Sequence, residues 1–370
     1  MGKQDHRAEM EAEKIVRVRE RLLEWYERNR RDLPWRRNRD PYAIWVSEIM
    51  LQQTRVAVVV ERYQAFMARF PTLLSLAIAP EQEVLAAWSG LGYYRRARML
   101  HKAAQFVADH CQGKLPRTAT ELRLLPGIGA YTAAAVASIA YGEQVAVVDG
   151  NVERVLCRME GWKAGSRTGG GAQLRRKIEA LAAELVCPER PGDSNQALME
   201  LGATLCSPRN PQCVVCPVAG DCKTQGEHQT APRPKMLRRE VAHALSVRSG
   251  RLAGQSNLQV LLEQRPAART VMPGLWELPA LTETAVPEDE LRLTVRHAIM
   301  QVNYSVRIRT VCEDEIDALT VAGGERRWVP LNDAAGMALT GLARKVLTRL
   351  HLLSAAPLDA IAPLEDGDVL

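Results

Sequence analysis

The spacing of apolar residues changes along the 370-residue chain. In the N-terminal part they return every three or four positions, which is typical of amphipathic helices. We expect helices at 13–31, 41–61, 82–88, 95–110, 119–124, 131–141, 152–160, 172–186 and 194–205. Asp40 and Pro41 stand where an N-cap and a first-turn proline would begin the second of these. This part is therefore predicted to be almost wholly helical.

A second pattern takes over in the C-terminal part. Apolar and polar residues alternate at 241–247, 258–263, 302–310 and 327–329, which predicts strands. Helical spacing returns near 288–293 and 339–350. The sequence therefore predicts a small α+β domain here.

Composition separates these parts. Residues 225–239 are polar and contain two prolines, which predicts a linker between a domain at 14–224 and another at 240–353. The tail at 354–370 is acidic and also contains two prolines, so we expect it to be disordered.

Hydropathy and charge limit the function classes. No apolar run approaches the roughly twenty residues of a membrane helix, and the polar N-terminus lacks the apolar core of a secretory signal. We therefore expect a cytoplasmic protein with no membrane partner. The formal charge is +6, and residues 229–370 hold 17 basic and 17 acidic residues, so the whole excess precedes residue 229. This suits an N-terminal domain that faces a polyanion, although on charge alone a solvated surface is the better explanation.

A glycine-containing turn precedes one predicted helix. Residues 125–132 read Leu-Pro-Gly-Ile-Gly-Ala-Tyr-Thr, and Gly127 and Gly129 permit a tight turn. The helix N-terminus that follows would offer unpaired N–H donors to a phosphate. Such a turn is a weak signal alone, because helix–helix turns often use glycine for steric reasons.

Four clustered cysteines give a stronger signal. Their spacing is Cys206-x6-Cys213-x2-Cys216-x5-Cys222. Zinc modules usually present two C-x2-C pairs, whereas one such pair flanked by longer spacings favours an iron-sulfur cluster. The remaining cysteines are interpreted as ordinary buried thiols, and they are Cys111, Cys157, Cys187 and Cys312.

Two carboxylates are candidates for acid–base chemistry. Glu48 shares a helix face with Ile44 and Leu51, so desolvation would raise its pKa toward the value that a general acid needs. On helix periodicity alone, however, a helix-edge glutamate paired with an arginine is the favoured alternative. Asp149 follows the apolar run 145–148 and precedes a predicted helix, so it could cap that helix or face a positive centre.

Six blocks in a fixed order resemble the MutY-type adenine DNA glycosylases of the helix-hairpin-helix, endonuclease III superfamily. The blocks are residues 33–36, 45–54, 90–94, 125–132, 148–151 and 206–222. The similarity spans residues 20–225. It implies a mainly α helix-hairpin-helix glycosylase domain with an iron-sulfur loop, and a C-terminal α+β Nudix-like domain.

The resemblance also implies an activity. Such a protein hydrolyses the N-glycosidic bond of adenine paired with 8-oxoguanine or guanine in double-stranded DNA, after the adenine leaves the stack. By this likeness Glu48 protonates the adenine, Asp149 stabilises the oxocarbenium-like sugar, and Tyr131 lies beside the same sugar. The four clustered cysteines would hold a 4Fe-4S cluster, and we expect a monomer that is associated with the nucleoid.

Further site residues follow from the same likeness. Pocket positions are matched by Arg31, Trp35, Arg36 and Leu51. Residues that wedge into the emptied space are matched by Gln53 and Tyr93, and further DNA or site contacts by Thr54 and Asn151.

Tyr131 bears on the type of reaction. Relatives of the endonuclease III type place a lysine here, whose amine forms a Schiff base and cleaves the strand. A phenol cannot do so, which predicts a monofunctional glycosylase. Thymine glycosylases acting on G:T mismatches share this tyrosine, so they remain an alternative, and a non-catalytic iron-sulfur DNA-binding protein is a third.

The C-terminal part favours the adenine enzymes. Residues 260–266 and 272–279 resemble the Nudix-like domain of that family, without the acidic box of true Nudix hydrolases. Where the family reads 8-oxoguanine with Phe-Ser-His, this chain has Ile299, Met300 and Gln301. Ile299 could supply the apolar wedge and Gln301 a hydrogen bond, whereas Met300 cannot replace a hydroxyl.

Overall fold

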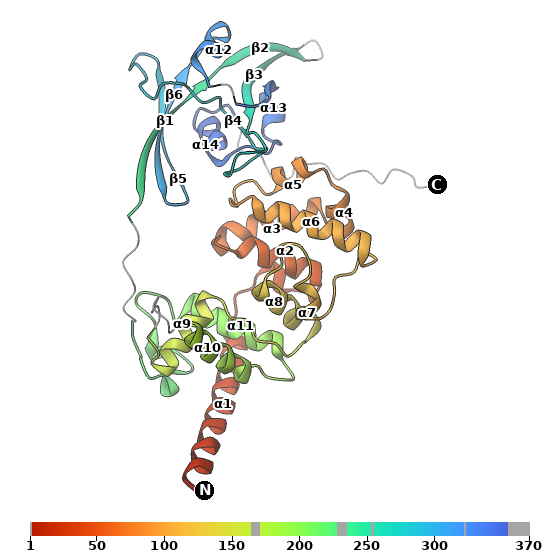
Figure 1. Cartoon of the computed structure of the whole chain (residues 1–370), viewed down its shortest axis with the longest axis vertical. Helices are drawn as coiled ribbons and strands as arrows, with labels where there is room; N and C mark the ends of the chain where they lie inside the picture. Colours follow the sequence, from red (N-terminus) through yellow and green to blue (C-terminus); the bar gives the residue numbers. More distant parts are fainter. Residues whose placement is uncertain (1, 164–170, 228–234, 253–254, 322, 354–370) are drawn as a thin grey trace. The chain divides into compact units, whose positions relative to one another are not determined.

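The chain forms two compact units (Figure 1). The computed structural model describes residues 2–163, 171–227, 235–252, 255–321 and 323–353. The first unit comprises Met1–Gln52 and Phe106–Pro232, and the second comprises Gln53–Gln105 and Arg233–Leu370. Both units therefore contain part of the helical region. The domain limits expected from composition stay a prediction, and the tail at 354–370 lies outside the described residues.

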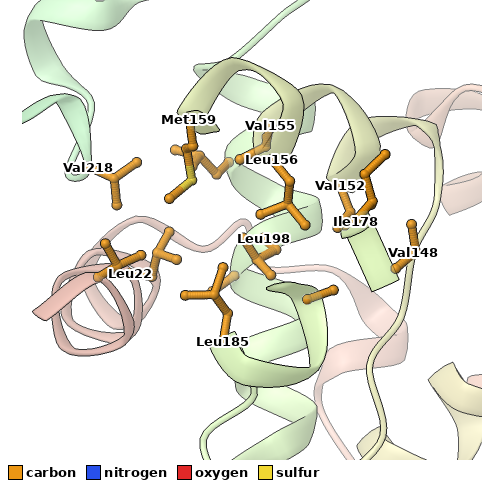
Figure 2. Close-up of a cluster of buried hydrophobic side chains, with 14 of the residues drawn as sticks. Leu22, Val148, Val152, Val155, Leu156, Met159, Ile178, Leu185, Leu198 and Val218 are labelled. Atoms are coloured by element: carbon orange, nitrogen blue, oxygen red, sulfur yellow. The ribbon is translucent and has the colours of Figure 1, made fainter. Parts of the chain in front are cut away.

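The first unit is helical. Its elements are α1 (Gly2–Asn29), η1 (Pro34–Arg36), α2 (Pro41–Leu51), α7 (Ala119–Leu122), α8 (Ala130–Tyr141), α9 (Gly150–Glu160), α10 (Gly171–Leu185), α11 (Pro191–Thr204), η2 (Cys213–Val215) and η3 (Ala219–Asp221). Helices α1, α9, α10 and α11 meet in one core, where Leu22, Leu156 and Leu198 are almost fully buried (Figure 2). Burial of each such side chain contributes about 1.5–3 kcal/mol.

The second unit begins with four helices, α3 (Val56–Arg69), α4 (Leu73–Ile78), α5 (Glu81–Ala87) and α6 (Arg95–His110), the last of which continues into the first unit. Edge-to-face aromatic contacts fix this group. The ring centroid of Phe66 lies 5.0 Å from that of Phe70 and 5.8 Å from that of Trp88. All three side chains are fully buried or nearly so.

Two small sheets complete the second unit. One has the order β1-β6-β5, in which β1 (Leu237–Leu245) is parallel and β5 (Leu291–Ile299) antiparallel to β6 (Val302–Thr310). The other joins β2 (Val247–Leu252), β3 (Gln255–Gln264), β4 (Trp276–Glu277) and β7 (Arg326–Pro330). The helices α12 (Ile316–Leu319), α13 (Leu331–Ala334) and α14 (Gly341–Arg349) pack with them, and the short turn η4 (Glu313–Glu315) precedes α12. The α+β class predicted for this region is confirmed.

The predicted helix at 41–61 is in fact two helices. Asp40 caps the first as expected, its carboxylate accepting a hydrogen bond from the Tyr42 N–H. The helix ends at Leu51, because Gln53 adopts a left-handed conformation with φ +57° that breaks the i to i−4 ladder. Apolar spacing continues across this break, so periodicity alone cannot reveal it.

The C-terminal part contains a second error. Residues 288–293, predicted as a helix, form a turn followed by the start of β5, because this segment pairs antiparallel with β6. Strand β2 and helix α4 were not expected from the pattern. The prediction for the remaining cysteines also fails in part, since Cys157 is buried whereas Cys312 is exposed at the turn that begins η4. Among the residues described, no helix has the length and apolar character needed to cross a membrane.

Candidate active site

Glu48 lies on a helix that is buried all round. Residues 42–50 of α2 are all buried, and the Glu48 side chain is only 6% exposed. Helix α2 packs against α8, which places the Tyr131 hydroxyl 2.7 Å from Glu48 Oε2 as a hydrogen-bond donor. The side chain is therefore enclosed, and it accepts a hydrogen bond from a phenol.

This environment changes the acidity of Glu48. Burial raises the pKa of its carboxyl to about 7, and the negative charge of Asp149 acts in the same direction. The hydrogen bond from Tyr131 and the positive charge of Arg36 act against that rise. A carboxylic acid with this pKa is half-protonated near neutral pH, as a general acid requires.

Tyr131 is held at the start of α8 by the glycine-containing turn. Gly127 has φ +74°, a conformation that favours glycine, whereas Gly129 is the extended N-cap of the helix. Burial, followed by the charge of Glu48, raises the pKa of the Tyr131 phenol well above its usual value. The phenol therefore stays neutral and keeps a proton to donate.

Asp149 caps α9. Its Oδ1 accepts hydrogen bonds from the N–H groups of Asn151 at 2.9 Å and Val152 at 2.7 Å, and its Oδ2 accepts from Asn151 Nδ2 at 2.9 Å. The capping role is therefore present. The same carboxylate is close enough to Glu48 to influence its pKa, so capping also fixes a negative charge beside the buried acid.

Arg31 and Arg36 converge on a carboxylate that sequence reasoning missed. Arg31 donates from Nε and Nη2 to the two oxygens of Glu200, at 2.7 and 2.8 Å, and Arg36 Nη2 donates to Oε2 at 2.8 Å. Trp35 lies in η1 beside Arg36 and is buried, and Leu51 is half-buried at the end of α2. An acidic residue among the apolar positions of the predicted helix at 194–205 was the signal that could have found Glu200.

The second unit contains the remaining candidate site residues of the helical region, Gln53, Thr54 and Tyr93. Gln53 and Tyr93 both have positive φ, +57° and +46°, and Tyr93 is half exposed. Thr54 and the Tyr93 turn share one partner, Arg96. Arg96 Nη2 donates to Thr54 Oγ1 at 3.1 Å and to the carbonyls of Leu91 and Gly92 at 3.0 and 3.1 Å. Arg96 thus joins the two turns and was also missed.

The three C-terminal candidates form the tip of a hairpin. Ile299 ends β5 and pairs with Val302 at the start of β6, so Met300 and Gln301 make a two-residue turn. Met300 has φ +54° and is 71% exposed. The Gln301 carbonyl accepts from the N–H of Leu237 at 2.9 Å, which ties this tip to β1.

The four clustered cysteines line a single pocket that is partly open to solvent. Arg158, almost fully buried, lies with Nη1 3.3 Å from Cys206 Sγ and donates to the carbonyls of Ser207 and Pro208. Within the described ranges, no three His, Cys, Asp or Glu side chains are grouped as ligands of one metal ion.

Comparison with known proteins identifies the class. Residues 46–186 match the HhH-GPD superfamily of base excision DNA repair proteins. The structure of a thermostable thymine-DNA glycosylase is 32% identical, with a TM-score of 0.52, over 58% of this chain and 97% of that one. The chain therefore belongs to the HhH-GPD superfamily. Its buried acid lies beside a helix that a glycine-containing turn precedes.

Among curated proteins, the chain is similar to adenine DNA glycosylases. The adenine DNA glycosylase of Homo sapiens is 48% identical over 220 residues, which cover 57% of this chain and 40% of that protein. The one from Arabidopsis thaliana is 37% identical over 340 residues, covering 80% of this chain and 52% of that protein. The chain spans about half the length of these relatives.

Proposed function

We propose that this chain is a monofunctional DNA glycosylase that removes adenine paired with 8-oxoguanine or guanine in double-stranded DNA. One observation carries the proposal: the buried Glu48 is protonatable near neutral pH, is hydrogen-bonded to Tyr131 and lies under the influence of Asp149. Relatives that are 37–48% identical over long segments are adenine DNA glycosylases, which supports adenine as the base.

The reaction divides into two steps. Glu48 gives its proton to a nitrogen of the flipped adenine, so that the N-glycosidic bond breaks and its electron pair leaves with the base. The fixed negative charge of Asp149 stabilises the oxocarbenium-like sugar that remains. The Glu48 carboxylate then takes a proton from a water molecule while the oxygen of that water bonds to the sugar carbon. This step restores the protonated acid.

Tyr131 limits the chemistry to hydrolysis. Its neutral phenol donates to Glu48 and offers no amine for a Schiff base with the sugar. Gln53 and Tyr93, on the turns joined by Arg96, are proposed to fill the space left by the adenine. Ile299, Met300 and Gln301 are proposed to contact the opposite base.

A thymine glycosylase acting on G:T mismatches is the second candidate, because a thymine-DNA glycosylase is a structural relative. Single-turnover base release from duplexes with A opposite 8-oxoguanine, A opposite guanine and T opposite guanine separates the two. We expect release of adenine and not of thymine, without strand cleavage. Release of thymine alone would establish the second candidate.

The rate of adenine release is expected to depend on pH through Glu48. Because its pKa is about 7 and the protonated form is active, the single-turnover rate should be constant below that value. It should fall about tenfold for each pH unit above it. A rate that stayed constant up to pH 9 would show that protonated Glu48 is not required.

We propose further that Cys206, Cys213, Cys216 and Cys222 hold a 4Fe-4S cluster. All four line one pocket, and thiolates are the usual ligands of such clusters. When bound, the cluster would cross-link the loop, which α1 also holds through the ion pair of Arg17 with Asp221.

Removing one ligand tests this site. Cys213→Ser should lose visible absorbance and bound iron and unfold at a lower temperature, because metal binding contributes to folding. Cys111→Ser, at a half-buried thiol outside the pocket, serves as the control and should keep both. A colourless wild-type protein that contained zinc would contradict the assignment.

A further inference from the structure

The contact between Glu200 and two arginines is the least expected feature of the site. Glu200 lies on α11 with 1% of its surface exposed. The backbone N–H of Arg31 donates a further hydrogen bond to Glu200 Oε1, at 3.2 Å. The Arg36 side chain is 13% exposed, and its Nη1 donates to the Arg31 carbonyl at 3.3 Å. Its guanidinium also lies over the Tyr26 ring, 5.6 Å from the centroid.

Glu200 is ionised in spite of its burial. Desolvation alone would raise its pKa, but hydrogen bonds from Arg31 and Arg36 outweigh this effect and bring the pKa to about 2. Burying a charge is costly unless it is paired, and truncating one partner leaves an uncompensated charge. Two guanidiniums and one carboxylate therefore form one fixed unit with a net charge of +1.

Arg36 connects this unit electrostatically with the proposed acid. The charged and titratable groups that act on Glu48 are Tyr131 from α8, Asp149 from the start of α9 and Arg36 from η1. Arg36 is the positive charge among them, and Glu200 is its ion-pair partner. Helix α11 also places Met199 Sδ 3.4 Å from the Tyr131 hydroxyl, so consecutive residues of this helix contact two of these three groups, Tyr131 and Arg36.

We propose that Glu200 is a positioning residue of the glycosylase site. It fixes the guanidiniums of Arg31 and Arg36 and offsets the positive charge that Arg36 presents to Glu48. This inference rests on the proposed function for its kinetic consequence, whereas its electrostatic part concerns the protein without DNA.

The first test is the nearly isosteric variant Glu200→Gln. Its amide keeps one accepting oxygen, replaces the other with a donor and loses the charge, so Arg36 would favour ionised Glu48 more strongly. We expect the alkaline fall in adenine release to begin about one pH unit lower, which is a roughly tenfold lower rate at pH 8. Below pH 6 the rate should change less.

Two companion variants separate charge from geometry. Glu200→Asp retains the charge and shortens the side chain, so the alkaline limb should stay in place while the rate falls at every pH. Adding Arg36→Gln to Glu200→Gln removes the uncompensated charge, so the limb should return toward its wild-type position. Asp193→Asn, which disturbs an arginine contact in the first turn of the same helix, is the matched control and should leave the limb unmoved.

A measurement without substrate distinguishes failure of the inference on Glu200 from failure of the proposed glycosylase function. Carbon-13 NMR of side-chain-labelled glutamate, with the Glu48 signal assigned by its absence in Glu48→Gln, follows the protonation of Glu48 directly. Its midpoint should fall in Glu200→Gln and recover in the double variant. An unchanged midpoint would overturn the inference, even if adenine release is lost. A shifted midpoint in a wild-type protein that releases no adenine would uphold the electrostatic inference and overturn the proposed function.

Discussion

Glu48→Gln is expected to release adenine at least a thousandfold more slowly than the wild type at every pH. Glutamine can still accept the hydrogen bond from Tyr131, but it has no proton to give to the base and cannot activate water afterwards. General acid–base catalysis contributes about 10²–10⁴-fold, and here one residue serves both steps. The check is single-turnover release from a duplex with A opposite 8-oxoguanine.

The same substitution should stabilise the fold at alkaline pH. The pKa of Glu48 is raised from its ordinary value of 4.5 to about 7, so ionising it in the folded state costs about 3 kcal/mol. That cost is absent below pH 4.5 and complete above about pH 7. The free energy of unfolding of Glu48→Gln in urea should therefore exceed the wild-type value at pH 8 and approach it at pH 4.

An exposed glutamate supplies the control. Glu61→Gln, on the solvent side of α3, should change neither the rate of adenine release nor the pH dependence of stability. An active Glu48→Gln protein would contradict the proposed mechanism. Equal stabilities of Glu48→Gln and wild type at pH 8 would show that the carboxyl is not desolvated as the structure indicates.

Local sequence signals predicted much of this fold. Asp40 followed by a proline marked the start of α2, and three-to-four spacing gave α6 and α8 to within one residue. The apolar neighbours of Glu48 on one helix face made a buried acid one of two alternatives, and the structure shows that Glu48 is buried. These features depend on residues within a few positions of each other, which is the range over which periodicity and capping operate.

Two of the features that the sequence did not predict depend on contacts between distant residues. Glu200 meets Arg31 across 169 positions, and nothing near either residue indicates the other. Residues 288–293 have helical spacing, but pairing with β6 decides their conformation. The left-handed Gln53 likewise interrupts an apolar pattern that continues through it. At residues 288–293, tertiary pairing overrides the local preference for a helix.

Asp149→Asn should separate the two roles of Asp149. Asparagine caps helices about as well as aspartate and can accept from the N–H groups of Asn151 and Val152, so the free energy of unfolding should change by less than about 1 kcal/mol. The negative charge is lost, so the sugar cation loses its stabilisation and the rate of adenine release should fall about 10²–10³-fold.

The charge of Asp149 also raises the pKa of Glu48, so Asp149→Asn should move the alkaline limb of any remaining activity to lower pH. Asp149→Ala removes the cap as well and should cost a further 0.5–2 kcal/mol or so of stability. Asp40→Asn, the same change at the cap of α2, should alter neither rate nor pH profile. If Asp149→Asn were fully active and Asp149→Ala inactive, capping of α9 would be the whole role of Asp149, and the sugar cation would need another stabilising group.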